Sequence, residues 1–88
     1  MVELKYTITD ALGLHARPAG LLVKAATGFQ SDIKIGTPKK MADAKRIMGV
    51  LSLALKCGET LTMTIEGADE EEAVKSMREH LAMLGVEA

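Results

Sequence analysis

Hydrophobic and polar residues alternate in three stretches of the chain, and each stretch predicts a β-strand. The alternation covers residues 2–8, returns at residues 32–35 and appears again at residues 61–66. A period of two is typical of a strand with one buried and one exposed face. A fourth, short strand is predicted over residues 39–44, after a turn at Gly36-Thr37-Pro38.

Three other stretches have the spacing of helices. Apolar residues recur every three or four positions from Ala19 to Phe29, as on one face of a helix, and Gly28 can end that helix. Residues 47–55 are rich in Met, Leu and Ala, which favour a short second helix closed by residues 57–59. Apolar spacing after residue 70 predicts a third helix that continues to Gly85.

The start of the third helix carries negative charge. Glu70, Glu71 and Glu72 form its first turn, where the helix dipole favours acidic side chains. Asp69 and Glu72 have the spacing of a capping box. The element order is therefore βαββαβα, which predicts an α+β fold with helices on one face of an antiparallel or mixed sheet.

Length and composition limit the kinds of protein that the chain can be. Its 88 residues suit one domain, residues 1–88, and 48% hydrophobic with 26% charged residues are ordinary values for a soluble globular protein. A formal net charge of -1 and only two aromatic residues, Tyr6 and Phe29, disfavour a small nucleic-acid-binding α/β domain. Salt-dependent binding of oligonucleotides would revive that rival.

The cysteine count and the hydropathy pattern predict a compartment. The single cysteine, Cys57, cannot form an internal disulfide, and we expect neither a metal site nor a bound cofactor. The first residues lack the pattern of a signal peptide, and no apolar run approaches the ~20 residues that span a bilayer. We expect a cytoplasmic protein without membrane insertion, in which Cys57 is buried or inert and His80 is structural or exposed.

The distinctive chemistry lies in residues 13–20, Gly-Leu-His-Ala-Arg-Pro-Ala-Gly, between the first strand and the first helix. Pro18 fits the first turn of a helix, where a missing N–H costs nothing, so His15 should lie at or just before the helix start. Unpaired N–H groups and the positive end of the helix dipole favour an anion beside the ring. A neutral imidazole keeps a lone pair for attack on a phosphoryl group, and Arg17 can bind two phosphate oxygens.

These residues can accept and donate a phosphoryl group, but they lack a second acid or base and a nucleotide-binding glycine loop. We therefore predict a covalent phosphoryl-transfer intermediate rather than an autonomous enzyme. The residue types alone leave a second interpretation open, in which His15 only caps a helix and Arg17 is solvated.

Residues 13–19 resemble the active-site signature of HPr, the histidine-containing phosphocarrier of the bacterial phosphoenolpyruvate:sugar phosphotransferase system. Residues 45–53, Lys-Arg-Ile-Met-Gly-Val-Leu-Ser-Leu, are similar to the second signature of that family. Chain length and element order agree over all 88 residues. The resemblance implies an open-faced β-sandwich, with three helices packed on one face of a four-stranded antiparallel sheet.

The resemblance also implies a function and partners. His15 corresponds to the histidine that phosphorylated Enzyme I phosphorylates on Nδ1, and Arg17 to the arginine that attends the phosphate. The phosphoryl group then passes to a sugar-specific enzyme IIA, and we expect the carrier to be a monomer. The predicted docking positions on helix one and at helix two are Gly20, Leu21, Lys24, Arg46, Ile47, Met48, Leu51 and Ser52.

Two positions depart from the family pattern. Where regulated members have a serine that an ATP-dependent kinase phosphorylates, this chain has Arg46, so we expect that arm of regulation to be absent. Arg46 is predicted to enlarge a cationic rim formed by Arg17, Lys24 and Lys45. Leu12 replaces a small polar residue and puts the transfer rate in question. The alternative function is an HPr-like regulatory or nitrogen-branch protein that binds regulators or enzymes through the same face.

Overall fold

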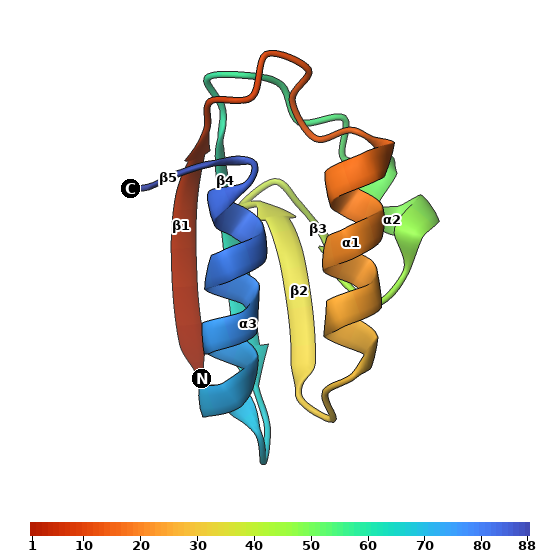
Figure 1. Ribbon diagram of the computed structural model, residues 1–88, viewed down its shortest axis with the longest axis vertical. Coiled ribbons are helices and arrows are strands. Elements are labelled where there is room, and N and C mark those ends of the chain that lie inside the picture. Colours follow the sequence, from red (N-terminus) through yellow and green to blue (C-terminus); the bar gives the residue numbers. More distant parts are fainter.

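The computed structural model describes all 88 residues, and its elements follow the order βαββαβαβ. In Figure 1 the helices lie on one side of the sheet, and the short α2 lies beside α1. The strands are β1 (Val2–Ile8), β2 (Asp32–Thr37), β3 (Lys40–Asp43), β4 (Thr60–Glu66) and β5 (Gly85–Glu87). The helices are α1 (Ala16–Thr27), α2 (Ile47–Leu51) and α3 (Glu70–Ala82).

The sheet has five antiparallel strands in the order β3-β2-β4-β1-β5, so the predicted count of four strands is one too few. The additional strand forms because α3 ends at Ala82 rather than at Gly85, and the chain then returns to pair with β1. A side chain at Gly85 would collide with the carbonyl oxygen of Thr7, so a glycine permits this close pairing. Three residues are too few for a visible alternation of polar and apolar positions.

The core lies between the helices and the inward face of the sheet. Nineteen buried hydrophobic residues form one cluster, and the alternate residues of β1 and β4 that point away from the helices are polar. Tyr6 is the one buried aromatic residue, and its hydroxyl donates a hydrogen bond to Glu87 Oε1 at 3.2 Å. Burial, followed by the Glu87 carboxylate, raises the pKa of Tyr6. The β5 strand is thereby joined to the core.

The boundaries of several elements differ from those predicted. Helix α2 ends at Leu51 instead of Leu55, because Ser52 and Leu53 form a turn and Ala54 adopts a left-handed conformation with φ of 50°. Strand β2 continues to Thr37, so the turn between β2 and β3 consists of Pro38 and Lys39 alone. Helix α1 spans Ala16–Thr27 rather than residues 19–29, and β3 spans Lys40–Asp43 rather than residues 39–44. Strand β1 and the start of α2 are where the sequence predicts them.

The predicted capping box of α3 is wrong. Asp69 is the residue before the helix, but its carboxylate makes no cap hydrogen bond to the first turn. It accepts hydrogen bonds from the backbone N–H groups of Gln30 and Ser31, each at 2.9 Å, and from the Ser31 hydroxyl. These bonds hold the pKa of Asp69 below its ordinary value, with the Ser31 hydroxyl the largest cause. Asp69 therefore joins the start of α3 to the segment that leads into β2.

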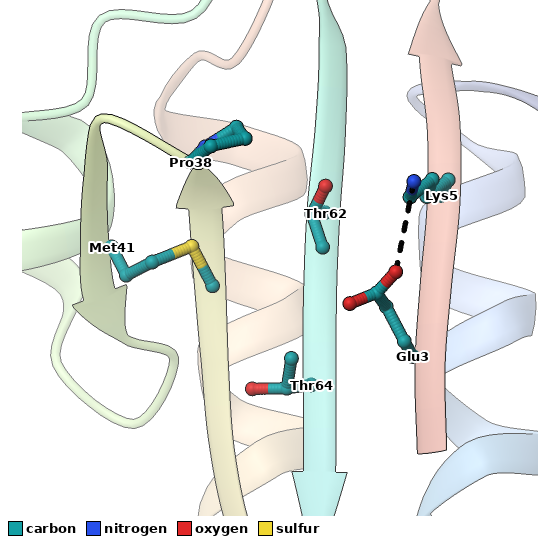
Figure 2. A pocket seen from close by; sticks show the side chains of 6 residues that line it. All are labelled: Glu3, Lys5, Pro38, Met41, Thr62 and Thr64. Carbon is teal, nitrogen blue, oxygen red and sulfur yellow. Dashed lines mark ion pairs between the residues drawn. The ribbon is translucent and has the colours of Figure 1, made fainter.

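The sheet face opposite the helices is uncovered and carries a shallow hollow (Figure 2). Its lining residues are Glu3, Lys5, Pro38, Met41, Thr62 and Thr64. The two charged members pair with each other, with Lys5 Nζ 3.7 Å from Glu3 Oε1. None of the predicted site residues lines this hollow.

Candidate functional site

His15 caps the N-terminus of α1, as predicted from the position of Pro18. Its backbone is extended, with φ of -120° and ψ of 172°, and its side chain makes no cap hydrogen bond to the first turn. Neither the N–H of Ala16 nor that of Arg17 has a hydrogen-bond partner, and Pro18 has no N–H. The helix therefore begins with unpaired donors beside an imidazole ring.

The loop between β1 and α1 is held in place by the segment that precedes β4, and the two segments run close together in Figure 1. Leu14 N–H donates to the carbonyl oxygen of Leu55 at 2.8 Å, and the Leu14 side chain is buried in the core. Gly13 has φ of 67°, and a Cβ there would lie only 2.5 Å from the same Leu55 oxygen. A glycine is therefore required immediately before the anchored residue, and together the two fix where His15 enters the helix.

The His15 side chain is partly exposed and contacts one carboxylate. Its exposed fraction is 30%, and Nε2 lies 3.3 Å from Asp10 Oδ2. The other carboxylate oxygen, Oδ1, accepts a hydrogen bond from Leu12 N–H at 2.9 Å. The Leu12 bond, followed by the His15 contact, holds the pKa of Asp10 below its ordinary value.

Sequence reasoning missed Asp10, because an aspartate after a strand is ordinary turn chemistry. A local sequence signal for the contact between Asp10 and His15 was nevertheless available. An aspartate that bonds the N–H two residues ahead keeps its second oxygen free, and His15 follows only five residues later.

Arg17 lies in the first turn of α1, exposed and without an ion pair. The same turn holds no acidic residue. The guanidinium donors, the free N–H groups and the helix dipole therefore all favour an anion next to His15.

The predicted docking residues lie on α1 and on or at the ends of α2, and these two helices pack against each other. Leu21, Ile47 and Met48 are exposed apolar residues, and Met48 is the most exposed of the three at 77%. Lys24, Arg46 and Ser52 are exposed, whereas Gly20 and Leu51 are half-buried. Leu12, in the loop beside His15, adds a fourth exposed apolar side chain at 74%.

The predicted cationic rim is smaller than expected. Lys45 turns inward, and its Nζ donates to the carbonyl oxygen of Phe29 at 2.8 Å, just beyond the end of α1. Arg46 caps α2 with no hydrogen bond from its side chain to the helix and lies 3.9 Å from Asp43 Oδ2. Arg17 and Lys24 are the exposed cations of α1.

The two other candidate residues lie elsewhere. His80 is half-buried on α3, and its Nδ1 lies 2.8 Å from the carbonyl oxygen of Ser76, which is a structural contact. Cys57 was predicted to be buried or inert; it is exposed, so the first alternative is wrong, while the second stays a prediction. It follows Leu55 and Lys56 in the loop before β4. No three His, Cys, Asp or Glu side chains are placed to share a metal ion. None of the helices is both long and apolar enough to cross a bilayer.

Comparisons with known proteins agree with this arrangement. Residues 2–83 match the sequence model of the HPr component phosphorylation site of the phosphotransferase system. The phosphocarrier protein HPr of Lysinibacillus sphaericus is 44% identical over 86 residues, which cover 98% of either chain. The HPr-like protein Crh of Halalkalibacterium halodurans is 44% identical over 77 residues, which cover 88% of this chain and 92% of the relative.

A solved structure has the same fold. The histidine-containing phosphocarrier protein of Mycoplasma superposes with a TM-score of 0.89 at 35% identity and covers 93% of both chains. The family match spans the loop of His15, α1 and α2 together, which are the elements that form the site. The chain belongs to the HPr family of phosphocarriers of the phosphotransferase system.

Proposed function

We propose that the protein accepts a phosphoryl group on His15 from phosphorylated Enzyme I and donates it to enzyme IIA domains of sugar transporters. One observation carries the proposal. His15 presents a partly exposed imidazole at a helix start that has free N–H donors, a neighbouring arginine and no acidic residue in its first turn. That combination suits the transient binding of a dianionic group.

The proposed chemistry needs no group beyond the ring and its surroundings. A lone pair of the neutral ring attacks phosphorus, and the charge on the phosphoryl oxygens is met by the first-turn N–H groups and by Arg17. Donors that are already oriented need no rearrangement during transfer. Because no residue of the site is suited to activate ATP, the chain acts as a carrier between two partners rather than as an autonomous enzyme.

Exposed apolar residues beside His15 support the proposed docking face. Leu21 on α1 and Ile47 and Met48 on α2 are exposed, and a partner that buried them together with His15 would exclude water from the transfer. Lys24 and Arg46 add positive charge, which favours association with an acidic partner surface. We propose that Gly20, Leu51 and Ser52 complete this face.

The proposal includes a monomer in the cytoplasm. What supports a monomer is the core, because the 19 buried hydrophobic residues form one cluster within a single chain. Sedimentation or light scattering across a range of concentrations measures the mass in solution. A constant mass near 9.4 kDa agrees with the proposal, and a dimer that persists on dilution contradicts it.

The decisive experiment supplies phosphoenolpyruvate and Enzyme I to the native chain and to His15→Ala. We expect acid-labile phosphate on the native chain and none on the variant. The matched control is His80→Ala, which removes the other imidazole and should still be phosphorylated. Phosphate on His15→Ala, or no phosphate on the native chain, contradicts the assignment.

A regulatory function is the second candidate, because the HPr-like protein Crh of H. halodurans is 44% identical. A regulatory protein would use the same face to bind regulators or enzymes and would be a poor donor to every enzyme IIA. Transfer from phosphorylated chain to several enzyme IIA domains distinguishes the two functions.

We also propose that the protein is not regulated by a kinase at residue 46, because this residue is an arginine and has no hydroxyl to phosphorylate. Stoichiometric phosphoserine at Ser52 or elsewhere, after incubation with the family's ATP-dependent kinase, contradicts this part of the proposal.

A further inference from the structure

Asp10 connects the loop before α1 to the ring of His15. One carboxylate oxygen accepts the Leu12 N–H bond of the loop at 2.9 Å, and the other lies 3.3 Å from His15 Nε2. The Asp10 and His15 side chains are about equally exposed, at 29% and 30%. No other carboxylate lies within ion-pair distance of this ring. The ring therefore has one defined partner within its own chain.

The direction of this hydrogen bond follows from the state of the carboxylate. Asp10 is ionised at neutral pH, as an ordinary aspartate is, and the Leu12 bond and the His15 contact lower its pKa further. An ionised carboxylate only accepts hydrogen bonds, so Nε2 of His15 has to carry the proton. In the neutral ring the lone pair is then on Nδ1.

We propose that Asp10 is a positioning residue that keeps the proton of His15 on Nε2 and orients the ring, so that Nδ1 takes the phosphoryl group. This inference rests on the proposed function of His15. Asp10 itself touches neither the phosphoryl group nor the partner. It acts through the ring, much as a carboxylate fixes the tautomer of a catalytic or metal-bound histidine.

The step balances without a proton transfer. The Nδ1 lone pair forms the new bond to phosphorus, while the bond from phosphorus to the donor protein breaks and its electron pair stays with the donor. The proton remains on Nε2, so the phosphorylated ring is a cation whose Nε2–H faces the Asp10 carboxylate. The carboxylate thereby stabilises the charge that develops on the ring.

Two substitutions separate this role from a purely structural one. In Asp10→Asn the single carbonyl oxygen can keep the Leu12 N–H bond, and the amide N–H₂ then faces the ring and donates to Nε2, which reverses the tautomer preference. In Asp10→Ser the hydroxyl can still accept the Leu12 N–H bond but is too short to reach the ring. Asp32→Asn, on the exposed side of β2, is the control for loss of one negative charge.

The first measurement is the ¹⁵N NMR spectrum of the His15 ring at a pH where the ring is neutral, in the unphosphorylated protein. We expect a protonated Nε2 in the native chain and in Asp32→Asn, a shift toward protonated Nδ1 in Asp10→Asn, and mixed tautomers in Asp10→Ser. The second measurement is the rate of phosphorylation by Enzyme I. We expect Asp10→Asn to be about tenfold slower than the native chain, the order expected when a hydrogen bond to a charged group is lost at a partly exposed site. Asp10→Ser should lie between the two.

The outcomes are distinguishable. If Asp10→Asn keeps both the native ¹⁵N pattern and the native rate, or loses rate without a change in the ring, the positioning role is overturned. An equal loss of rate in Asp32→Asn overturns it as well, because the effect is then one of overall charge. If the native chain is not phosphorylated at all, the proposed function fails, and the ¹⁵N spectra alone then decide whether Asp10 sets the tautomer.

Discussion

Helix α1 follows the N-cap residue His15 and has no acidic residue in its first turn, whereas α3 follows the N-cap residue Asp69 and carries Glu70, Glu71 and Glu72 there. Both helices follow a strand, and both present a positive dipole end. Helix α3 meets that charge with its own carboxylates. Helix α1 has no carboxylate in its first turn to offset the positive dipole end, and Arg17 adds a further positive charge there.

The two aspartates that precede these helices show the same contrast. Asp69 bonds a distant segment, Gln30 and Ser31, and so joins elements of the fold. Asp10 bonds only its own loop and the ring of His15. One carboxylate serves the stability of the fold and the other serves the site. The comparison teaches that a helix start without acidic residues, rather than the histidine alone, creates a binding site for an anion.

The largest effect is expected from removal of Arg17, the cation in the first turn of α1. Arg17→Gln keeps a long polar side chain but loses the charged pair of donors, so the rate of phosphorylation by Enzyme I should fall about 10- to 100-fold. Because Arg17 is exposed and unpaired, the thermal unfolding midpoint should stay the same. The control is Arg78→Gln on α3, which changes the same charge and should keep the native rate. Equal losses in the two variants would show that only net charge matters.

A second substitution gives α1 the chemistry of α3. Ala16 is the exposed first residue of α1, and Ala16→Glu places an acid there. The helix should become more stable by about 0.3 to 1 kcal/mol through its dipole. Phosphorylation should slow by about tenfold, because the new carboxylate repels the incoming phosphoryl group through screened charge.

Chemical denaturation and the Enzyme I assay measure these two effects separately. Ala16→Gln, which has the same shape without the charge, should be close to native in both. A faster or unchanged rate in Ala16→Glu would remove the basis of the comparison between the two helix ends.

The third prediction concerns Asp69, at the start of α3, and the dependence of stability on pH. The pKa of Asp69 is lowered in the folded chain, so its contribution to stability is complete above the ordinary value of 3.8 and is lost as the pH falls through the folded value. Asp69→Asn should therefore be less stable than native at neutral pH, and the two curves of unfolding free energy should converge in acid. Ser31→Ala, which removes the buried hydroxyl that bonds Asp69, should cost about 1 kcal/mol.

Urea unfolding across the acid range tests this prediction. Asp10→Asn is the matched comparison, because the pKa of Asp10 is also lowered but its carboxylate holds only a loop. It should change the pH dependence of stability less than Asp69→Asn does. The reverse order would contradict the division between a carboxylate for the fold and a carboxylate for the site.

Much of the fold can be predicted from local sequence patterns. The contacts that make the start of α1 different from the start of α3 cannot. Alternation placed β1, β2 and β4, and Pro18 placed His15 at the start of α1, because both signals act within a few residues. The capping box at Asp69 was wrong because its partner Ser31 lies 38 positions away in the chain. No local spacing encodes such a pairing.

The site divides in the same way. Residue types predicted an anion-binding end with His15 and Arg17, since nucleophile and cation lie in one segment. The Asp10 contact depends on how the loop folds back on Leu55, which only the structure shows. Lys45 lies outside the predicted rim for a similar reason, because its Nζ donates to the carbonyl oxygen of Phe29, 16 positions away in the chain.

The smallest effect is expected at the third helix end, α2, where Arg46 adds a cation to the positive end of a five-residue helix. Its backbone is extended, with φ of -123° and ψ of 111°, which is the conformation of a capping residue. Arg46→Ser supplies a hydroxyl that can accept an N–H bond from the first turn, so the free energy of unfolding should rise by about 0.5 kcal/mol. Arg46→Ala is the control, because it loses the same charge and the same weak contact with Asp43 without supplying a cap. If the two variants are equally stable, α2 gains nothing from a cap. The contrast between helix ends is then confined to α1 and α3, which are longer helices with larger dipoles.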